Sequence, residues 1–554
     1  MNMSGVKEQV GSFFVNLGMV ILGGLCFVAA FPNPLIKQGV PLLGWLAYIP
    51  LYWVVNRSKF LPSVLWGAFY WFFAYSLFNY WLSAFHPVAS IIVNSLVVVY
   101  MSIVTAATRF SLVVFPKRGY ILQCLCWVVF QYSHTRGFLS YPYGILGYSQ
   151  WQVPPVLQLA SITGVWGVSA LMIFPQLYIA AALKDWFPGK GISLWGTIKR
   201  FLSGERIAGG LYAVVFAAVL VYGFLSPVDY AGAPTVRIAL VQHNTDPWKP
   251  SKAPTPKQSL VEYQKDLRIL RRLSSEALAA EPKPDMVVWS ETAFVPRIYW
   301  HTTYRDDPES YILIRELMDY LKNQDVPFVI GNDDARLEMN ENGNYDQVDY
   351  NAVFLYERDE LKQLYRKIIL VPFTEYFPYK KQLPWVYEIL ENADTHFWKK
   401  GIETTVFETS TGLKFSTPIC FEDSFGYLSR DFVRNGAEIL VNLTNDAWSK
   451  SLSAQYQHLA MAVFRAVENR RSMVRSTASG QTCGIDPNGR ILAMAEPFTE
   501  AQLTVTVPLV KNKTFYTEHG DYVPQFSFVA VLLLLLGGVG RGIIKKVHNT
   551  RKKA

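Results

Sequence analysis

The sequence predicts a polytopic α-helical membrane domain joined to an α/β extramembrane domain, and three observations support this prediction. Apolar residues are concentrated at positions 10–230 and 526–544, whereas the region between them reads as an ordinary soluble domain. Charged residues account for 17% of the 554 residues, well below the roughly 25% that is usual for soluble domains. The middle region alternates strand-like and helical patterns, which is typical of a layered α/β fold.

Eight apolar segments are predicted to cross a membrane, since a crossing helix needs about 20 residues. Seven precede the soluble domain and one follows it, near positions 11–31, 40–55, 62–82, 88–115, 120–133, 160–182, 208–226 and 526–540. The first could be read as a signal peptide, but further spans follow it and no small-residue cleavage site is evident. We therefore expect it to remain as a helix.

Basic residues between the spans predict their orientation. The loops after the second, fourth and sixth spans are rich in Lys and Arg, and the odd-numbered loops are poorer. Because cytoplasmic loops carry the positive excess, we expect a seven-span domain at 1–230, an outside domain at 231–522, and a final span with a basic cytoplasmic tail at 523–554. The net charge of +9 then reflects membrane topology, and we expect no nucleic-acid partner.

The middle domain shows the periodicities of strands and helices in alternation. Strands are predicted at 236–242, 285–289, 327–331, 351–356, 437–442, 473–477 and 482–485, and helices at 260–278, 311–321, 425–435 and 456–470. A two-strand signal at 408–418 contains a Ser-Thr-Gly turn and leads to Cys420. The Asp-Pro-Asn-Gly stretch at 486–489 predicts a further turn.

Three stretches of this domain place reactive side chains at the ends of apolar runs. Cys420 follows one strand-like run and Glu291 ends another, while Lys367 and Glu375 stand on either side of a third. Taken singly, a cysteine is more often a small buried hydrophobe, and a lysine is usually a solvated partner of an acid. Together they suit acyl chemistry, because a thiol needs a base near neutral pH and a cation stabilises a developing oxyanion.

In this order, the three stretches resemble the Glu-Lys-Cys triad of the nitrilase, or carbon–nitrogen hydrolase, superfamily. The resemblance implies an αββα sandwich. It also implies that Glu291 is the base, Lys367 the oxyanion-stabilising residue and Cys420 the nucleophile. Glu375 and Glu422 would support them by orienting groups or relaying protons.

Further motifs are spread along the whole chain: Phe78-Asn79-Tyr80-Trp81, Gly147-Tyr148-Ser149-Gln150, Ala239-Leu240-Val241-Gln242, Leu370-Val371-Pro372-Phe373-Thr374-Glu375-Tyr376, Asn445-Asp446-Ala447-Trp448, Arg465-Ala466-Val467-Glu468 and Asp486-Pro487-Asn488-Gly489-Arg490. With these motifs the chain resembles, over nearly its full length, the bacterial apolipoprotein N-acyltransferase family, in which eight spans carry a periplasmic nitrilase-like domain. This combination is far more specific than any one motif.

The family pattern also implies substrate-binding residues. Trp248 matches a functional tryptophan near the pocket, and Asn351 matches a pocket asparagine. Phe421 stands where the family often has Tyr, which removes a hydroxyl but keeps the ring. A second departure is Ala478-Ser479-Gly480, where Asn-Asn-Gly is common. Neither departure touches the triad.

The resemblance implies a two-step acyl transfer without a cofactor or a metal. Cys420 would take an acyl chain from a membrane phospholipid, expected to be the sn-1 chain of phosphatidylethanolamine. The thioester would then acylate the α-amine of the diacylglyceryl-cysteine at the N-terminus of an apolipoprotein. The enzyme would lie in the bacterial inner membrane with its catalytic domain on the periplasmic side.

Two predicted features concern the surroundings of the site. The aromatic, glycine-rich loop at 138–150 is either an interfacial aromatic belt or a floor under the active site that contacts lipid. The apolar segments at 298–300 and 377–385 would keep water away from the thioester.

Three other functions stay open on the sequence alone. The first is a membrane-tethered amidase, which hydrolyses instead of transferring. The second is a scaffold with an inactive nitrilase domain, although the intact triad argues against it. The third is a transporter, although the confident spans carry no charged residue apart from Arg109, unlike most ion-coupled carriers.

Two local alternatives also stay open. The five cysteines show no disulfide or zinc spacing, but a Cys420–Cys483 disulfide would block the predicted chemistry. Arg465 and Glu468 lie three apart on a predicted helix and could form only a surface ion pair.

Overall fold

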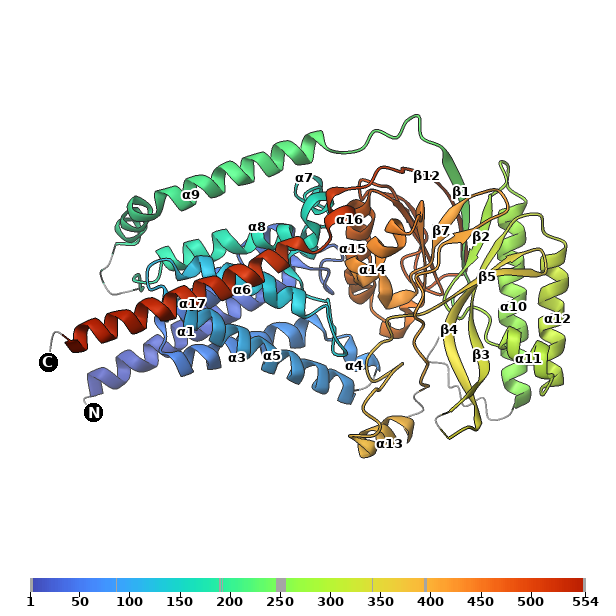
Figure 1. Cartoon of the computed structure of the whole chain (residues 1–554), viewed down its shortest axis with the longest axis horizontal. Coiled ribbons are helices and arrows are strands. Elements are labelled where there is room, and N and C mark those ends of the chain that lie inside the picture. Colours follow the sequence, from blue (N-terminus) through green and yellow to red (C-terminus); the bar gives the residue numbers. More distant parts are fainter. Residues whose placement is uncertain are drawn as a thin grey trace.

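The chain forms two parts, which Figure 1 shows side by side. The computed structural model describes residues 3–85, 87–188, 191, 193–245, 256–340, 342–392 and 396–551. A bundle of long helices includes both the first and the last helix of the chain, and a sandwich of two β-sheets lies at the other end of the molecule.

Helices occupy all eight ranges in which spans are predicted. They are α1 (Met3–Ala30), α2 (Tyr48–Arg57), α3 (Phe60–Phe78), α5 (Pro87–Val114), α6 (Gly119–Ser133), α8 (Ala160–Ala182), α9 (Leu194–Leu225) and α17 (Tyr522–Arg551). Among the described residues, six helices are long and apolar enough to cross a membrane. The other two, α2 and α6, have 10 and 15 residues, so eight crossings stay a prediction.

Helix α8 forms the centre of the bundle. In its most apolar window 72% of the residues are buried, against 11% in α9 and in α17, which lie at the outside. The side chain of Gln176 in α8 accepts a hydrogen bond from the Tyr48 N–H (2.7 Å) and donates one to the Gly44 carbonyl (3.0 Å). The buried amide of Gln176 is therefore satisfied within the bundle, as a membrane requires.

Short helical segments connect the long helices. They are η1 (Pro41–Trp45), α4 (Leu82–Phe85), η2 (Leu146–Gln150) and α7 (Pro154–Leu157). Figure 1 shows α4 and α7 on the side of the bundle that faces the sheets.

The soluble part contains two six-stranded mixed sheets. The first has the order β12 (Ala501–Pro508), β1 (Thr235–Gln242), β2 (Met286–Trp289), β3 (Phe328–Met339), β4 (Tyr345–Glu357), β5 (Glu360–Arg366). The second has the order β11 (Ile491–Met494), β10 (Cys483–Ile485), β9 (Ser472–Thr477), β8 (Ile439–Thr444), β7 (Lys414–Ser416), β6 (Phe407–Glu408). The central strands β1-β2-β3 and β7-β8-β9 are parallel.

Helices cover the outer face of each sheet, which confirms the predicted αββα sandwich (Figure 1). Helices α10 (Pro256–Leu278) and α12 (Pro308–Lys322) pack on the first sheet, and α14 (Gly426–Arg434) and α15 (Leu452–Asn469) on the second. Strand β1 shows the alternation: Ala239 and Val241 belong to the core under α10 and α12, whereas Ile238 and Leu240 belong to the core between the sheets.

Every strand and helix predicted for the soluble part is present, although the pattern missed several elements. The missed elements are β5, β11, β12, α11 (Ile298–Tyr304), α13 (Pro384–Asn392) and α16 (Phe515–His519). Strand β5 reads Glu-Leu-Lys-Gln-Leu-Tyr-Arg and lies at a sheet edge. It therefore lacks the apolar run by which buried strands are recognised.

Helix α15 joins the two parts, because it lies between the second sheet and the bundle. The Trp81 indole N–H donates to the Gln457 side chain (3.1 Å), and the Gln457 amide donates to the Pro32 carbonyl (3.0 Å). Arg465 and Glu468 are 0% and 1% exposed and pair with each other (3.0 Å). The alternative of a surface ion pair is therefore wrong, because the bundle covers the side of α15 that the pattern leaves to solvent.

Candidate active site

The three predicted catalytic residues stand just after the ends of three strands. Glu291 follows β2, Lys367 follows β5, and Cys420 begins the 3-10 turn η3 (Cys420–Ser424) after β7. The first two strands belong to one sheet and the third to the other. The site therefore lies where the two sheets meet, with each side chain held at the end of a rigid element.

Glu291 is 8% exposed and is held from three directions. Its Oε1 accepts hydrogen bonds from the Asn351 amide (2.9 Å) and the Lys367 ammonium (3.3 Å). Its Oε2 accepts the backbone N–H of Asn445 (3.1 Å). These donors fix the orientation of the carboxylate, which a general base requires.

Gly331 in β3 makes room for the loop that carries Glu291. A Cβ atom at this position would collide with the Ser290 carbonyl and lie 2.7 Å from the Thr292 nitrogen. Thr292 itself has a positive φ of 44°. The close approach of β3 therefore requires glycine, and it holds the loop in a strained conformation.

Lys367 is 1% exposed and lies between two carboxylates. Its Nζ is 3.3 Å from Glu291 Oε1 and 2.8 Å from Glu375 Oε1. Burial opposes the charged form, but Glu291 and Glu375 outweigh it, and the pKa of Lys367 lies well above its usual value. The ammonium is therefore charged at neutral pH, and the prediction that it could be a solvated surface lysine is wrong.

Cys420 has a φ of +49°, a left-handed conformation that is uncommon for a non-glycine residue. The Asn442 amide of β8 donates to the carbonyls of Pro418 (3.0 Å) and Cys420 (3.3 Å). These bonds hold the turn that presents the thiol. Strain of this kind clusters at functional sites, where the surrounding structure holds it in place.

The thiol of Cys420 is not ionised in the resting site. Burial raises its pKa well above the usual value, the Glu291 carboxylate raises it further, and Lys367 only partly offsets them. Cys420 and Cys483 are both free thiols, so the alternative of a disulfide between them is wrong. The proton of Cys420 must therefore leave as the sulfur attacks, and Glu291 is the carboxylate that acts most strongly on the thiol.

Glu375 and Glu422 have different surroundings. Glu375 binds Lys367 and also accepts the Val371 N–H through Oε2 (2.9 Å). Glu422 is fully buried, accepts the backbone N–H of Ile368 (2.7 Å) and Ile419 (2.8 Å), and receives the Tyr365 hydroxyl at 2.9 Å. Glu422 thus ties the Lys367 loop to the Cys420 loop, although burial raises its pKa to about 7.

Of the three predicted substrate-binding residues, two can be placed. Asn351 binds Glu291 directly, so it belongs to the support of the base. Phe421 is 8% exposed and packs edge-on against Phe425 (4.9 Å between ring centroids). Trp248 lies outside the described residues.

A buried charge cluster behind Cys420 was missed by the sequence analysis. His458 of α15 lies 2.6 Å from the Asp423 carboxylate and 2.8 Å from that of Asp446, and Arg475 of β9 pairs with both acids. Burial disfavours the imidazolium, but the two acids outweigh it and raise the pKa of His458 to about 9. The cluster links the Cys420 turn to the loop that binds Glu291, which includes η4 (Asp446–Ser449). In the sequence, only the motif Asn445-Asp446-Ala447-Trp448 indicated part of this cluster.

The loop at 138–150 contacts the soluble part. The ring of Phe138 lies 5.2 Å from that of Phe373 and 5.4 Å from that of Tyr379. Burial raises the pKa of Tyr143 well above its usual value, and the charge of Asp446, in the cluster behind Cys420, raises it further. The loop therefore reaches the surroundings of the nucleophile. This position agrees better with a floor under the active site than with an interfacial aromatic belt.

The two apolar segments predicted to exclude water differ in position. Phe377 is buried beside the Phe138 ring (6.2 Å) and thus lies near the loop that carries Glu375. Ile298 instead packs in the core beneath α10 and α12. The structure therefore gives no support for a role of Ile298 at the site.

Taken together, the site can perform acyl transfer through a covalent intermediate. It offers a thiol at a strained turn, an oriented carboxylate to take its proton, and a buried ammonium to stabilise an oxyanion.

Comparisons with known proteins agree with this geometry. The carbon-nitrogen hydrolase family matches residues 237–514, and the apolipoprotein N-acyltransferase N-terminal domain matches residues 23–177. The first match covers all three triad positions. The second covers most of the helical bundle.

Relatives of similar length are known in several bacteria. Apolipoprotein N-acyltransferase 1 of Treponema denticola is 41% identical over 96% of this chain and 97% of its own length. The protein of the same name in Treponema pallidum is 41% identical over 97% of both chains. Apolipoprotein N-acyltransferase of Geobacter metallireducens is 32% identical over 91% of both.

Among solved structures, an amidase from Nesterenkonia sp. matches 55% of this chain and 99% of its own, with 17% identity and a TM-score of 0.36.

Proposed function

The chain belongs to the apolipoprotein N-acyltransferase family, and on that premise we propose how its own residues carry out the transfer. It is an acyltransferase that fits the final step of bacterial lipoprotein maturation. We propose that the donor is a membrane phospholipid, that the intermediate is a thioester on Cys420, and that the acceptor is the α-amine of the N-terminal diacylglyceryl-cysteine of an apolipoprotein.

In the first half-reaction, the Cys420 sulfur attacks the carbonyl carbon of a phospholipid ester. Its proton passes to the Glu291 carboxylate, and a negative charge develops on the carbonyl oxygen near the Lys367 ammonium. As the tetrahedral intermediate collapses, the carbon–oxygen bond to the glycerol breaks. Glu291 returns the proton to that oxygen, and a lysophospholipid leaves.

In the second half-reaction, the α-amine of the acceptor attacks the thioester carbon. Glu291 takes a proton from the amine, the carbon–sulfur bond breaks, and the sulfur leaves as the thiol after it regains that proton. The products are an amide and the free enzyme, so no proton or electron is left over. Amide formation from a thioester is downhill and needs no nucleotide.

One observation carries this proposal: the buried Lys367 ammonium touches both Glu291 and Glu375, and its charge acts on Cys420. Three distant segments of the chain thus place a base, a cation and a nucleophile together. A transporter or an inactive scaffold would not require this arrangement.

We further propose how the enzyme sits in the membrane. Residues 1–230 form a seven-span domain, residues 231–522 a periplasmic catalytic domain, and residues 523–554 a last span with a cytoplasmic tail. In this orientation the loop at 138–150 lies between the outer leaflet and the site, where it would guide acyl chains and exclude water. Trp248 and Phe421 are proposed to contact the acyl chain, and Asn351 to hold the base.

Intact mass spectrometry of the purified protein after incubation with phosphatidylethanolamine tests the proposal. The wild type should gain the mass of one acyl chain, and Cys420→Ala should gain none. Cys483→Ala is the matched control, because it removes a buried thiol of the same domain and should still be acylated. A diacylglyceryl-cysteine peptide should then remove the acyl mass and gain it.

Each outcome has a clear meaning. Acylation of Cys420→Ala would disprove the assignment of the nucleophile. An adduct that water removes, while the peptide stays unmodified, would indicate a hydrolase of the amidase type instead of a transferase.

A further inference from the structure

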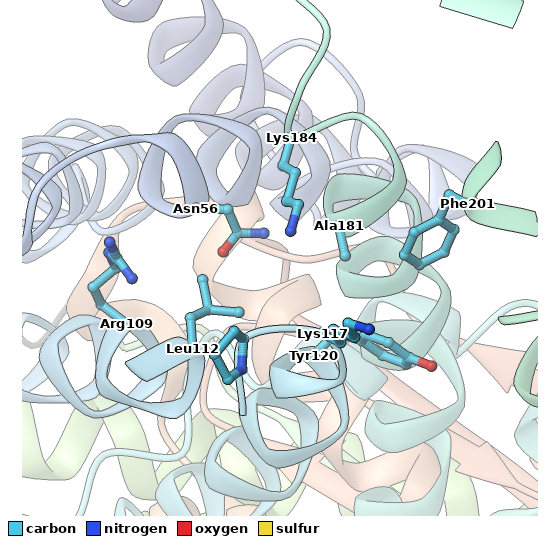
Figure 2. A pocket seen from close by; sticks show the side chains of 9 residues that line it. Asn56, Arg109, Leu112, Lys117, Tyr120, Ala181, Lys184 and Phe201 are labelled. Carbon is cyan, nitrogen blue, oxygen red and sulfur yellow. The ribbon is translucent and has the colours of Figure 1, made fainter. Parts of the chain in front are cut away.

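A polar cavity, whose lining is shown in Figure 2, lies at the end of the bundle that is remote from the sheets. Val165, near the start of α8, donates its N–H to Glu468 of α15 (3.1 Å), whereas Ala181, near the end of α8, lines this cavity. Its volume is about 180 Å³. It is lined by Asn56, Arg109, Leu112, Pro116, Lys117, Tyr120, Ala181, Lys184 and Phe201.

Three cations from different segments line this cavity. Arg109 belongs to α5, Lys117 precedes α6, and Lys184 follows α8. The Arg109 Nε donates to the Ser58 carbonyl (3.1 Å), which anchors the guanidinium and leaves its two terminal nitrogens for another partner. Within the described part of the chain, none of the three forms an ion pair.

Among the side chains that the structure describes, no acidic one lines the cavity. The acidic residues of the first 230 positions are Glu8, Asp185, Glu205 and Asp229. Glu205 already binds the Arg118 guanidinium (3.1 Å) and the Tyr120 hydroxyl (2.9 Å). Asp185, next to Lys184, is exposed to solvent. An excess of positive charge therefore remains at the cavity.

The Asn56 side chain also presents a hydrogen-bond donor to the cavity. The Asn56 carbonyl oxygen accepts the Gln123 amide (3.1 Å), so the side chain presents its NH₂ group. This nitrogen is buried and has no hydrogen-bond partner among the described residues. In Figure 2, Asn56 lies between Arg109 and Lys184. A guanidinium, ammonium groups and an unpaired amide NH₂ together suit an anion with several acceptor oxygens.

We propose that this cavity binds the phosphate group of an anionic phospholipid of the cytoplasmic leaflet. The inference rests on the membrane orientation proposed above and not on the acyl transfer. Basic pockets between membrane helices on the cytoplasmic side are suited to such headgroups. The volume of the cavity corresponds to about six water molecules, which is enough for a phosphate group. A drug-sized ligand needs a larger cavity, of about 300–1,000 Å³.

The apolar residues of the wall agree with a lipid as the source of the phosphate. Leu112 and Phe201 line the same cavity as the cations. A phospholipid presents its phosphate beside apolar chains, whereas a free phosphate ion is hydrated on all sides. The geometry therefore favours phosphatidylglycerol, or another lipid of that charge, over inorganic phosphate.

The test uses the full-length protein with Cys420→Ala, so that the lipid is not consumed at the active site. Native mass spectrometry measures how much phosphatidylglycerol the protein retains in competition with phosphatidylcholine. The variant Arg109→Gln/Lys184→Gln is compared with Lys199→Gln/Arg206→Gln, which removes the same charge from exposed positions of α9 at the same end of the bundle. A parallel thermal unfolding series with inorganic phosphate tests the free ion.

We expect the cavity variant to retain about thirtyfold less phosphatidylglycerol, because it loses two basic residues that contribute about 1 kcal/mol each at an anionic membrane surface. The surface variant should retain several-fold more phosphatidylglycerol than the cavity variant does. An equal loss of phosphatidylglycerol in the two variants would contradict the proposal that this cavity binds the lipid. If inorganic phosphate stabilises the protein and no lipid is retained, the assignment of a phospholipid would be wrong. The cavity would then be a site for a free anion. If the double variant does not fold, Lys184→Gln alone should still retain less phosphatidylglycerol than Lys199→Gln, and equal retention would contradict the site.

Discussion

The two helical layers of the sandwich are built on the same plan but have different surroundings. Helices α10 and α12 place one apolar stripe on the first sheet and leave their other faces to solvent. Helix α15 is buried along almost its whole length, because the second sheet covers one side and the membrane bundle covers the other. The outer layer therefore depends on apolar burial, and the inner layer also depends on paired polar groups.

This difference bears on how the domain folds. A buried polar group costs free energy unless it is hydrogen-bonded, and the partners of α15 include Tyr148 and Val165 of the bundle. Without the bundle, Arg465 and Glu468 would lose part of their hydrogen bonding and a large surface would be exposed. The catalytic domain is thus completed by the membrane domain.

The largest expected effect is the loss of the buried ion pair of α15. Arg465→Ala leaves Glu468 buried without its cation, which should cost about 3–5 kcal/mol. Arg272→Ala is the matched control, because Arg272 pairs with Glu276 and Glu500 at the exposed face of α10 and an exposed pair contributes about 0.2–1 kcal/mol. Thermal unfolding of the full-length protein in detergent measures both. Equal losses would remove the distinction between the layers.

The next effect depends on pH. The pKa of His458 is about 9 in the folded protein and about 6.5 in an unfolded chain. Its contribution to stability is therefore complete below pH 6.5 and is lost as the pH rises through 9, on the order of 3 kcal/mol. Unfolding at a series of pH values should show this decline, and His458→Gln should flatten it. An unchanged slope in the variant would assign the decline to other groups.

A smaller effect is expected for the hydrogen bonds that join α15 to the bundle. Gln457→Leu removes the bonds to the Trp81 indole and the Pro32 carbonyl, which should cost about 1–3 kcal/mol. Gln264→Leu on the exposed face of α10 should change stability by no more than about 0.5 kcal/mol. Chemical denaturation of the two variants side by side provides the measurement. A neutral Gln457→Leu would mean that these bonds do not stabilise the contact.

The smallest expected effect concerns the outer layer alone. Asp307 caps α12 by accepting the N–H groups of Glu309 (3.0 Å) and Ser310 (3.3 Å). Asp307→Ala should cost about 1 kcal/mol and leave the rate of acyl transfer per folded molecule unchanged, because α12 does not contact the site. Activity and melting temperature measured on one preparation separate the two quantities. A lower specific activity would show that the outer layer affects the site.

Glu291 and Cys420 could be assigned to strand ends because each follows an apolar run that is visible in the sequence. Lys367 follows β5, which has no such run, so it was found only through the apolar run after it and the family pattern. The partners of His458 could not be predicted, because Asp423 and Arg475 lie on other elements and no spacing connects them. Local periodicity records one covered face of a helix, so it predicted Arg465 at a surface that the bundle in fact covers.

The left-handed backbone of Cys420 has a consequence for evolution. A glycine would adopt the same conformation without the roughly 1–2 kcal/mol that a side chain costs there. Backbone strain would therefore not oppose the exchange of this cysteine for glycine in a lineage that no longer needed the enzyme. Selection for activity, and not the backbone conformation, keeps a side chain at this position.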